Sequence, residues 1–153
     1  MNTAQTFTTR SAAETEGLGK GLARDLRGGD ILLLEAELAA GKTTFVRGLV
    51  EGLGGNPVTV SSPTFVLIQT YNCNNSSIRT VHHVDLYRLS ERASDLRETG
   101  IEDALSDAFA VVAVEWPKDA IATWIPADAR VWRVGIIIEK DDIRTIEVNG
   151  PGQ

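Results

Sequence analysis

Residues 32–44 hold the side chains of this chain that are best suited to chemistry. They read Leu-Leu-Leu-Glu-Ala-Glu-Leu-Ala-Ala-Gly-Lys-Thr-Thr, an apolar strand followed by a short turn that ends in Gly-Lys-Thr. This is the pattern of a Walker A loop, whose backbone amides surround nucleotide phosphates. Gly41 lets the backbone approach phosphate, Lys42 supplies a charge for the β- and γ-oxygens, and the Thr43 hydroxyl suits Mg²⁺. The alternative is that this short pattern occurs by chance in a plain strand–turn–helix. Other residues must therefore support the prediction of a nucleotide site.

Two alanines depart from the usual form of this loop. The pattern commonly opens with glycine where this chain has Ala36, and Ala39 stands where related loops often need a positive φ. That conformation costs a residue other than glycine about 1 kcal/mol. We therefore expect the two methyl groups to strain the loop and weaken nucleotide binding. A nucleotide-binding scaffold with weakened hydrolysis is one alternative that follows.

Two carboxylates stand where predicted strands end. Asp85 follows residues 81–84 and Glu115 follows the apolar residues 111–114. Phosphate chemistry needs a carboxylate near Mg²⁺ and a group that orients water, and open α/β sheets bind ligands at the carboxyl ends of parallel strands. The strand before Asp85 belongs to a predicted hairpin, so its direction is left open. The alternative role for either acid is a solvated turn residue.

The remaining polar residues carry weaker signals. His82 and His83 have no Cys or His at zinc-ligand spacing, so we expect one to face the core and the other the solvent. Residues 61–65, Ser-Ser-Pro-Thr-Phe, could sense a γ-phosphate or could simply form a turn. Cys73 is the only cysteine, which excludes an internal disulfide and fits a reducing compartment.

Composition narrows the function classes. The 153 residues are 42% hydrophobic and 24% charged, as in an ordinary globular protein, and carry a net charge of −6. This charge argues against strong direct binding of nucleic acid. We find neither a signal sequence nor a membrane-spanning run, and no linker divides the chain. We therefore expect a cytoplasmic protein in which residues 1–153 form a single domain.

The predicted elements alternate between helix and strand, which indicates an α/β fold. Ser11 and Glu14 form a capping box for a helix that ends at Gly28. The run at 31–34 suits a parallel strand buried on both faces, and the next helix buries the apolar stripe from Phe45 to Leu53. One hairpin is predicted from residues 65–71 and 78–84, and a second from residues 131–139 and 143–148. Between them we expect a helical segment in two pieces at 91–105 and a strand at 110–114. The prediction is three layers around a mixed sheet with a parallel core and antiparallel hairpin strands.

Four segments together resemble the TsaE (YjeE) family of small bacterial P-loop ATPases. They are residues 38–49 around Gly-Lys-Thr-Thr, 62–65 (Ser-Pro-Thr-Phe), 83–89 (His-Val-Asp-Leu-Tyr-Arg-Leu) and 115–117 (Glu-Trp-Pro). Their order and spacing agree with the family from about residue 9 to residue 117, with Ala36, Glu37 and Ala39 as departures. The resemblance implies a P-loop NTPase fold. It also implies a Mg²⁺-dependent ATPase that works with TsaD and TsaB on threonylcarbamoyladenosine in tRNA, and that is slow without them.

The resemblance also implies roles for individual residues. Lys42 would be catalytic and bind phosphate, Asp85 would be the Walker-B-like carboxylate, and Glu115 would orient water. Thr43, Asp85 and Glu115 would serve the Mg²⁺ ion. Trp116 would lie beside the nucleotide and Thr15 near its adenine. Thr64 would lie in a switch-like loop, and Arg88 would contact phosphate or a partner. The residues that would bind ATP or ADP directly are Leu38, Ala39, Ala40, Gly41, Lys42, Thr43 and Thr44.

A small-molecule kinase on the same core is the second alternative. The chain is short and shows no evident arginine-rich lid for a second substrate, which disfavours this reading.

Overall fold

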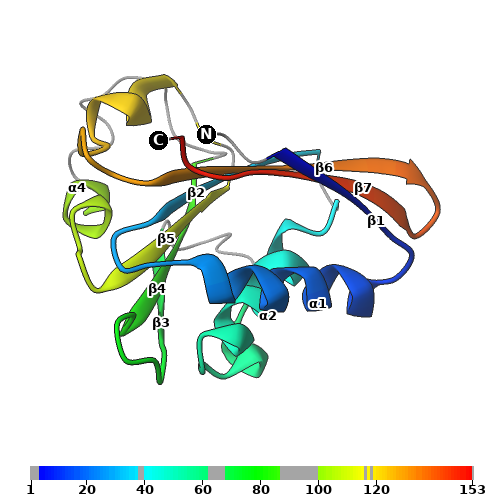
Figure 1. Cartoon of the computed structure of the whole chain (residues 1–153), viewed down its shortest axis with the longest axis horizontal. Coiled ribbons are helices and arrows are strands. Elements are labelled where there is room, and N and C mark those ends of the chain that lie inside the picture. The colour runs from blue at the N-terminus through cyan, green and yellow to red at the C-terminus, as the bar shows by residue number, and fades with distance from the viewer. Residues whose placement is uncertain are drawn as a thin grey trace.

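A computed structural model describes residues 4–37, 40–61, 68–86, 100–115, 117 and 119–152. Within these ranges seven strands form one sheet in the order β1-β7-β6-β2-β5-β4-β3 (Figure 1). The strands are β1 (Ala4–Thr9), β2 (Ile31–Ala36), β3 (Ile68–Asn72), β4 (Thr80–Asp85), β5 (Ala110–Glu115), β6 (Val131–Lys140) and β7 (Ile143–Asn149).

The centre of the sheet is parallel and its two sides are antiparallel, as predicted. β2 pairs in parallel with β5 and β6, and β4 pairs in parallel with β5. β3 and β4 form one antiparallel hairpin, and β6 and β7 form another to which β1 is added. The direction of β4, which the sequence left open, is therefore parallel to its inner neighbour. As a result Asp85 and Glu115 reach the same edge of the sheet.

Helices cover both faces of the sheet (Figure 1). On one face lie α1 (Ala12–Leu22) and α2 (Lys42–Gly52), and the stripe from Phe45 to Leu53 packs there on β2, β5 and β6. On the other face α4 (Ile101–Leu105) and the 3-10 helix η3 (Asp119–Thr123) pack against Ile31, Leu33 and β5. The predicted three layers are present. Short 3-10 turns at Ala23–Asp25 (η1) and Pro57–Thr59 (η2) follow α1 and α2.

The first helix and the first strand differ from the sequence prediction. The side chain of Ser11 accepts a hydrogen bond from the Glu14 amide at 3.1 Å, so the predicted cap is confirmed. However, α1 ends at Leu22 and not at Gly28, with Ala23–Asp25 in a 3-10 turn. β1 was not predicted, because it is an edge strand of mostly exposed polar residues. No helix among the described residues is long and apolar enough to cross a membrane.

Candidate functional site

The site begins where β2 passes into α2. β2 ends at Ala36, and α2 begins at Lys42 behind Gly41, whose φ of 109° belongs to the left-handed region that favours glycine. The Lys42 side chain turns back over this connection. Its Nζ donates to the carbonyl oxygens of Ala36 at 3.2 Å and Glu37 at 3.1 Å. The ammonium is thus held at the head of α2, where the helix amides also favour an anion.

Two carboxylates face this lysine from neighbouring strands. Asp85 and Glu115 are the last residues of β4 and β5 and lie directly opposite each other in the parallel pairing. Burial lowers the pKa of Lys42, and the negative charges of Glu115 and Asp85 act against that shift. Three charged residues that lie 30 to 73 positions apart in the sequence therefore meet at one edge of the sheet. Lys42 is 5% exposed, so these charges interact with little screening by water.

The Glu115 carboxylate is held by a histidine. His83 and Glu115 are both buried, and His83 Nε2 is hydrogen-bonded to Glu115 Oε2. On the other side of the ring, His83 Nδ1 lies 3.3 Å from the Tyr71 hydroxyl oxygen. The expectation that one histidine faces the core is confirmed by His83. His82 is only partly exposed, because its Nε2 contacts Asp107 at 3.1 Å.

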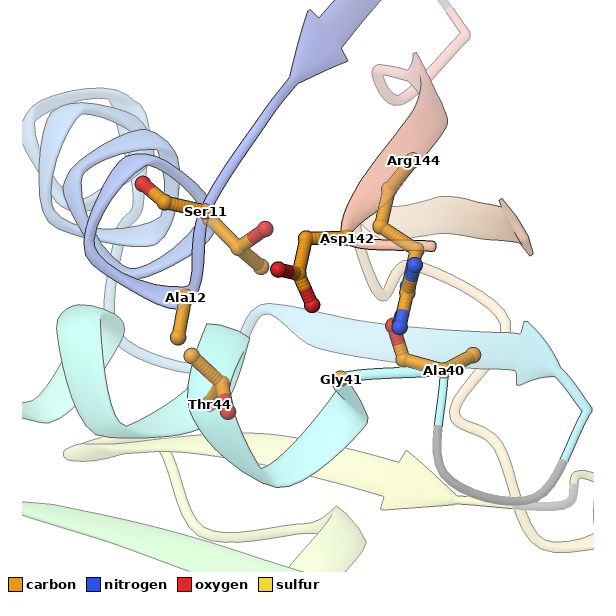
Figure 2. A pocket seen from close by; sticks show the side chains of 8 residues that line it. Ser11, Ala12, Ala40, Gly41, Thr44, Asp142 and Arg144 are labelled. Carbon is orange, nitrogen blue, oxygen red and sulfur yellow. Dashed lines mark hydrogen bonds between the residues drawn. The ribbon is translucent and has the colours of Figure 1, made fainter. Parts of the chain in front are cut away.

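A small cavity lies between α1, the start of α2 and the β6–β7 turn (Figure 2). Its volume is about 210 Å³, and it is lined by Ser11, Ala12, Thr15, Ala40, Gly41, Thr44, Asp142 and Arg144. Thr15 is buried, and its hydroxyl oxygen lies 2.8 Å from the hydroxyl oxygen of Thr9, in a hydrogen bond between the two side chains. The structure therefore places Thr15 in one cavity with Ala40, Gly41 and Thr44.

Arg144 is a site residue that the sequence analysis missed. It reaches from β7 toward the loop, and its Nε donates to the Ala40 carbonyl oxygen at 3.0 Å (Figure 2). The two residues are 104 positions apart. No local pattern links residues so distant, so only the folded structure shows this contact.

One expectation about the loop is wrong. The methyl group of Ala36 was expected to strain the loop, but Ala36 is the last residue of β2 and lies opposite Ile136 in β6. Among the described residues only Asp141 combines a side chain with a positive φ, so position 36 carries no such strain. Several predicted site residues lie outside the described residues: Leu38, Ala39, Thr64, Arg88 and Trp116.

The residues at this edge offer oxygen ligands of the kind that Mg²⁺ prefers. No group of three or more His, Cys, Asp or Glu side chains among the described residues could enclose a metal. Mg²⁺ does not need such a cage, because it binds through one or two protein oxygens with phosphates and water completing its shell. The Asp85 carboxylate and the half-buried Thr43 at the first turn of α2 fit that requirement.

The fold and this site define a layered α/β protein with a buried lysine and two carboxylates at the carboxyl edge of a mixed sheet. A family profile described as "Threonylcarbamoyl adenosine biosynthesis protein TsaE" matches residues 9–146. The chain belongs to this TsaE family.

Individual proteins agree with this assignment. The chain is 37% identical over 138 residues to the "tRNA threonylcarbamoyladenosine biosynthesis protein TsaE" of Streptomyces coelicolor, covering 89% of this chain and 90% of that protein. It is 40% identical over 111 residues to the protein of the same name from Rickettsia conorii, with 72% of this chain matched but only 60% of the relative's length. Among solved structures, Bacillus subtilis YdiB matches with a TM-score of 0.71 and 28% identity, over 99% of this chain and 88% of that one.

Proposed function

We propose that the chain is a Mg²⁺-dependent ATPase with a P-loop NTPase fold, which converts ATP and water to ADP and phosphate. The observation that carries this proposal is the meeting of Lys42, Asp85 and Glu115 at the head of α2. A cation at a helix N-terminus suits the transferred phosphate, and nearby carboxylates suit its metal and its attacking water.

Each residue has a distinct task in this proposal. Lys42 leaves or shares its contacts with the Ala36 and Glu37 carbonyls and neutralises the β- and γ-oxygens. The amides at the start of α2 bind the same phosphates, and the cavity beside Thr15 receives the nucleoside. Thr43 and Asp85 hold the metal. When bound, Mg²⁺ neutralises charge that develops on the phosphate oxygens.

Glu115 acts on the attacking water in this scheme. Its Oε2 is engaged by His83, which leaves Oε1 to accept a hydrogen bond from water. In this scheme Glu115 would serve both the attacking water and the metal, and Asp85 would help to hold the metal.

We further propose that this activity supports TsaD and TsaB in threonylcarbamoyladenosine modification of tRNA, in the cytoplasm. The names of the relatives support the pathway. The net charge of −6 supports a role in which TsaD and TsaB, and not this chain, hold the tRNA. Hydrolysis is then slow for the isolated protein and faster in their presence.

The test is phosphate release from ATP with Mg²⁺, measured for the wild type and for Lys42→Ala, with and without TsaD and TsaB. Lys20→Ala is the matched control, because Lys20 is exposed and paired with Glu51 away from the site. We expect Lys42→Ala to abolish release and Lys20→Ala to retain it. Equal release by the wild type and Lys42→Ala would refute the proposal.

A further inference from the structure

A chain of hydrogen bonds crosses three neighbouring strands and ends on Glu115. It starts at Tyr71 on β3, passes through the His83 ring on β4 and reaches the Glu115 carboxylate on β5. Each member is less than 9% exposed, and His83 is fully buried. We propose that His83 is a positioning residue that fixes the Glu115 carboxylate for the attacking water, and that Tyr71 fixes His83; this inference rests on the proposed ATPase function.

The chemistry of the contacts supports this role. An ionised carboxylate only accepts hydrogen bonds, so His83 Nε2 carries the hydrogen that Glu115 Oε2 receives. A single donor at Oε2 determines which way the carboxylate plane turns and which oxygen remains for water. A misplacement of about 1 Å in a reacting group can reduce a rate by roughly 100-fold, so this orientation matters for catalysis.

Tyr71 is itself held in place. Its oxygen is hydrogen-bonded to Gln69 and lies 3.3 Å from the carbonyl oxygen and 3.4 Å from the amide nitrogen of Ser61. Burial raises the pKa of Tyr71, so it remains a neutral hydroxyl near neutral pH. The β3–β4 hairpin is thereby a rigid support for the His83 ring.

The neighbouring histidine provides a matched control within the same strand. His82 Nδ1 lies 2.9 Å from the Thr70 hydroxyl, and its Nε2 contacts Asp107 at 3.1 Å. It thus repeats the hydroxyl–imidazole–carboxylate order. Because successive strand residues point to opposite faces, His82 faces away from Glu115 and Lys42. The two series of hydrogen bonds share this order of groups but differ in location and burial, since Thr70 is exposed and His82 and Asp107 are only partly buried.

The kinetic test uses three variants of the proposed series, His83→Leu, His83→Gln and Tyr71→Phe, and two controls, His82→Gln and Thr70→Val. For each protein, kcat and KM are measured for ATP with Mg²⁺, and the affinity for a non-hydrolysable ATP analogue is measured by calorimetry. We expect His83→Leu to lower kcat by roughly 10- to 100-fold with unchanged analogue affinity. His83→Gln, whose amide also donates, restores much of kcat, and Tyr71→Phe costs about fivefold. The controls keep the wild-type kcat.

A spectroscopic test reads the contact without hydrolysis. The chain has two histidines, so His82→Gln leaves only the His83 ring signals in a long-range ¹H–¹⁵N spectrum. In that background Glu115→Gln and Tyr71→Phe should each shift the His83 nitrogens, while Thr70→Val should not. This measurement remains informative if His83→Leu does not fold.

The outcomes separate the inference from the proposed function. A wild type without ATPase activity overturns the proposed function and with it the positioning role. An active wild type with an equally active His83→Leu overturns only the positioning role, as does a His83 ring that does not respond to Glu115→Gln. Reduced analogue affinity in parallel with kcat would make His83 a structural residue of the nucleotide site.

Discussion

The position of α2, and with it Lys42, depends on how closely α1 approaches it. The two helices meet at glycines, and a methyl group added at Gly48 would lie 1.8 Å from the Glu16 carbonyl oxygen of α1. That is about 1.6 Å closer than an ordinary contact, and the obstacle is backbone, which does not rotate away. Gly48→Ala therefore forces the helices apart.

We expect Gly48→Ala to lower the free energy of unfolding by about 3 kcal/mol, the upper part of the range for overpacked cores. For a chain of this size that corresponds to a fall of roughly 6–12 °C in melting temperature. Because α2 begins at Lys42, the affinity for Mg-ATP should fall as well. Thermal denaturation and calorimetric titration measure the two effects.

Gly17→Ala is the matched control for this prediction. Gly17 is an exposed residue of α1 with nothing within 4 Å of the added methyl group. There the same substitution improves helix propensity by about 1 kcal/mol and should raise the melting temperature by roughly 2–4 °C. A Gly48→Ala protein as stable as the wild type would refute the close packing of α1 on α2.

Four further predictions concern the site, the loop before α2 and the free cysteine. Asp85→Ala should abolish Mg²⁺-dependent phosphate release while the circular dichroism spectrum is kept, and full activity would remove Asp85 from the metal site. Arg144→Gln loses the bond from Nε to the Ala40 carbonyl and should weaken calorimetric ATP affinity about fivefold, whereas unchanged affinity would contradict a role in shaping the loop. Because burial raises the pKa of Cys73, its reaction with Ellman's reagent at pH 8 should be slower in the folded than in the denatured protein; equal rates would count against this. Ala39→Gly should tighten ATP binding several-fold if the loop carries about 1 kcal/mol of strain, and equal affinity would show that it does not.

The elements beside the loop were readable from sequence because each has a strong local signal. β2 begins with the apolar run from Ile31 to Leu34, and α2 combines Gly-Lys-Thr with a helical stripe that ends before Gly54. β1 has no such signal, since its residues are mostly polar and its pairing with β7 depends on a segment about 140 positions away. Local patterns therefore predicted the centre of the sheet and its β3–β4 side, and missed the edge strand β1.

The candidate site divides in the same way. The residue types of Lys42, Asp85 and Glu115, and the strand-end positions of the two acids, singled them out as candidate site residues before the strand order was known. The contacts from His83 to Glu115 and from Arg144 to Ala40 join residues 32 and 104 positions apart. Such contacts arise from strand pairing and hairpin placement, which no spacing in the sequence encodes.

A crystal structure of the protein with Mg²⁺ and a non-hydrolysable ATP analogue tests the central claim most directly. We expect the β- and γ-phosphates to lie at the head of α2 within hydrogen-bonding distance of Lys42 Nζ, with Thr43 and Asp85 at the metal. A nucleotide bound elsewhere, with Lys42 Nζ still donating to the Ala36 and Glu37 carbonyls, would contradict this claim.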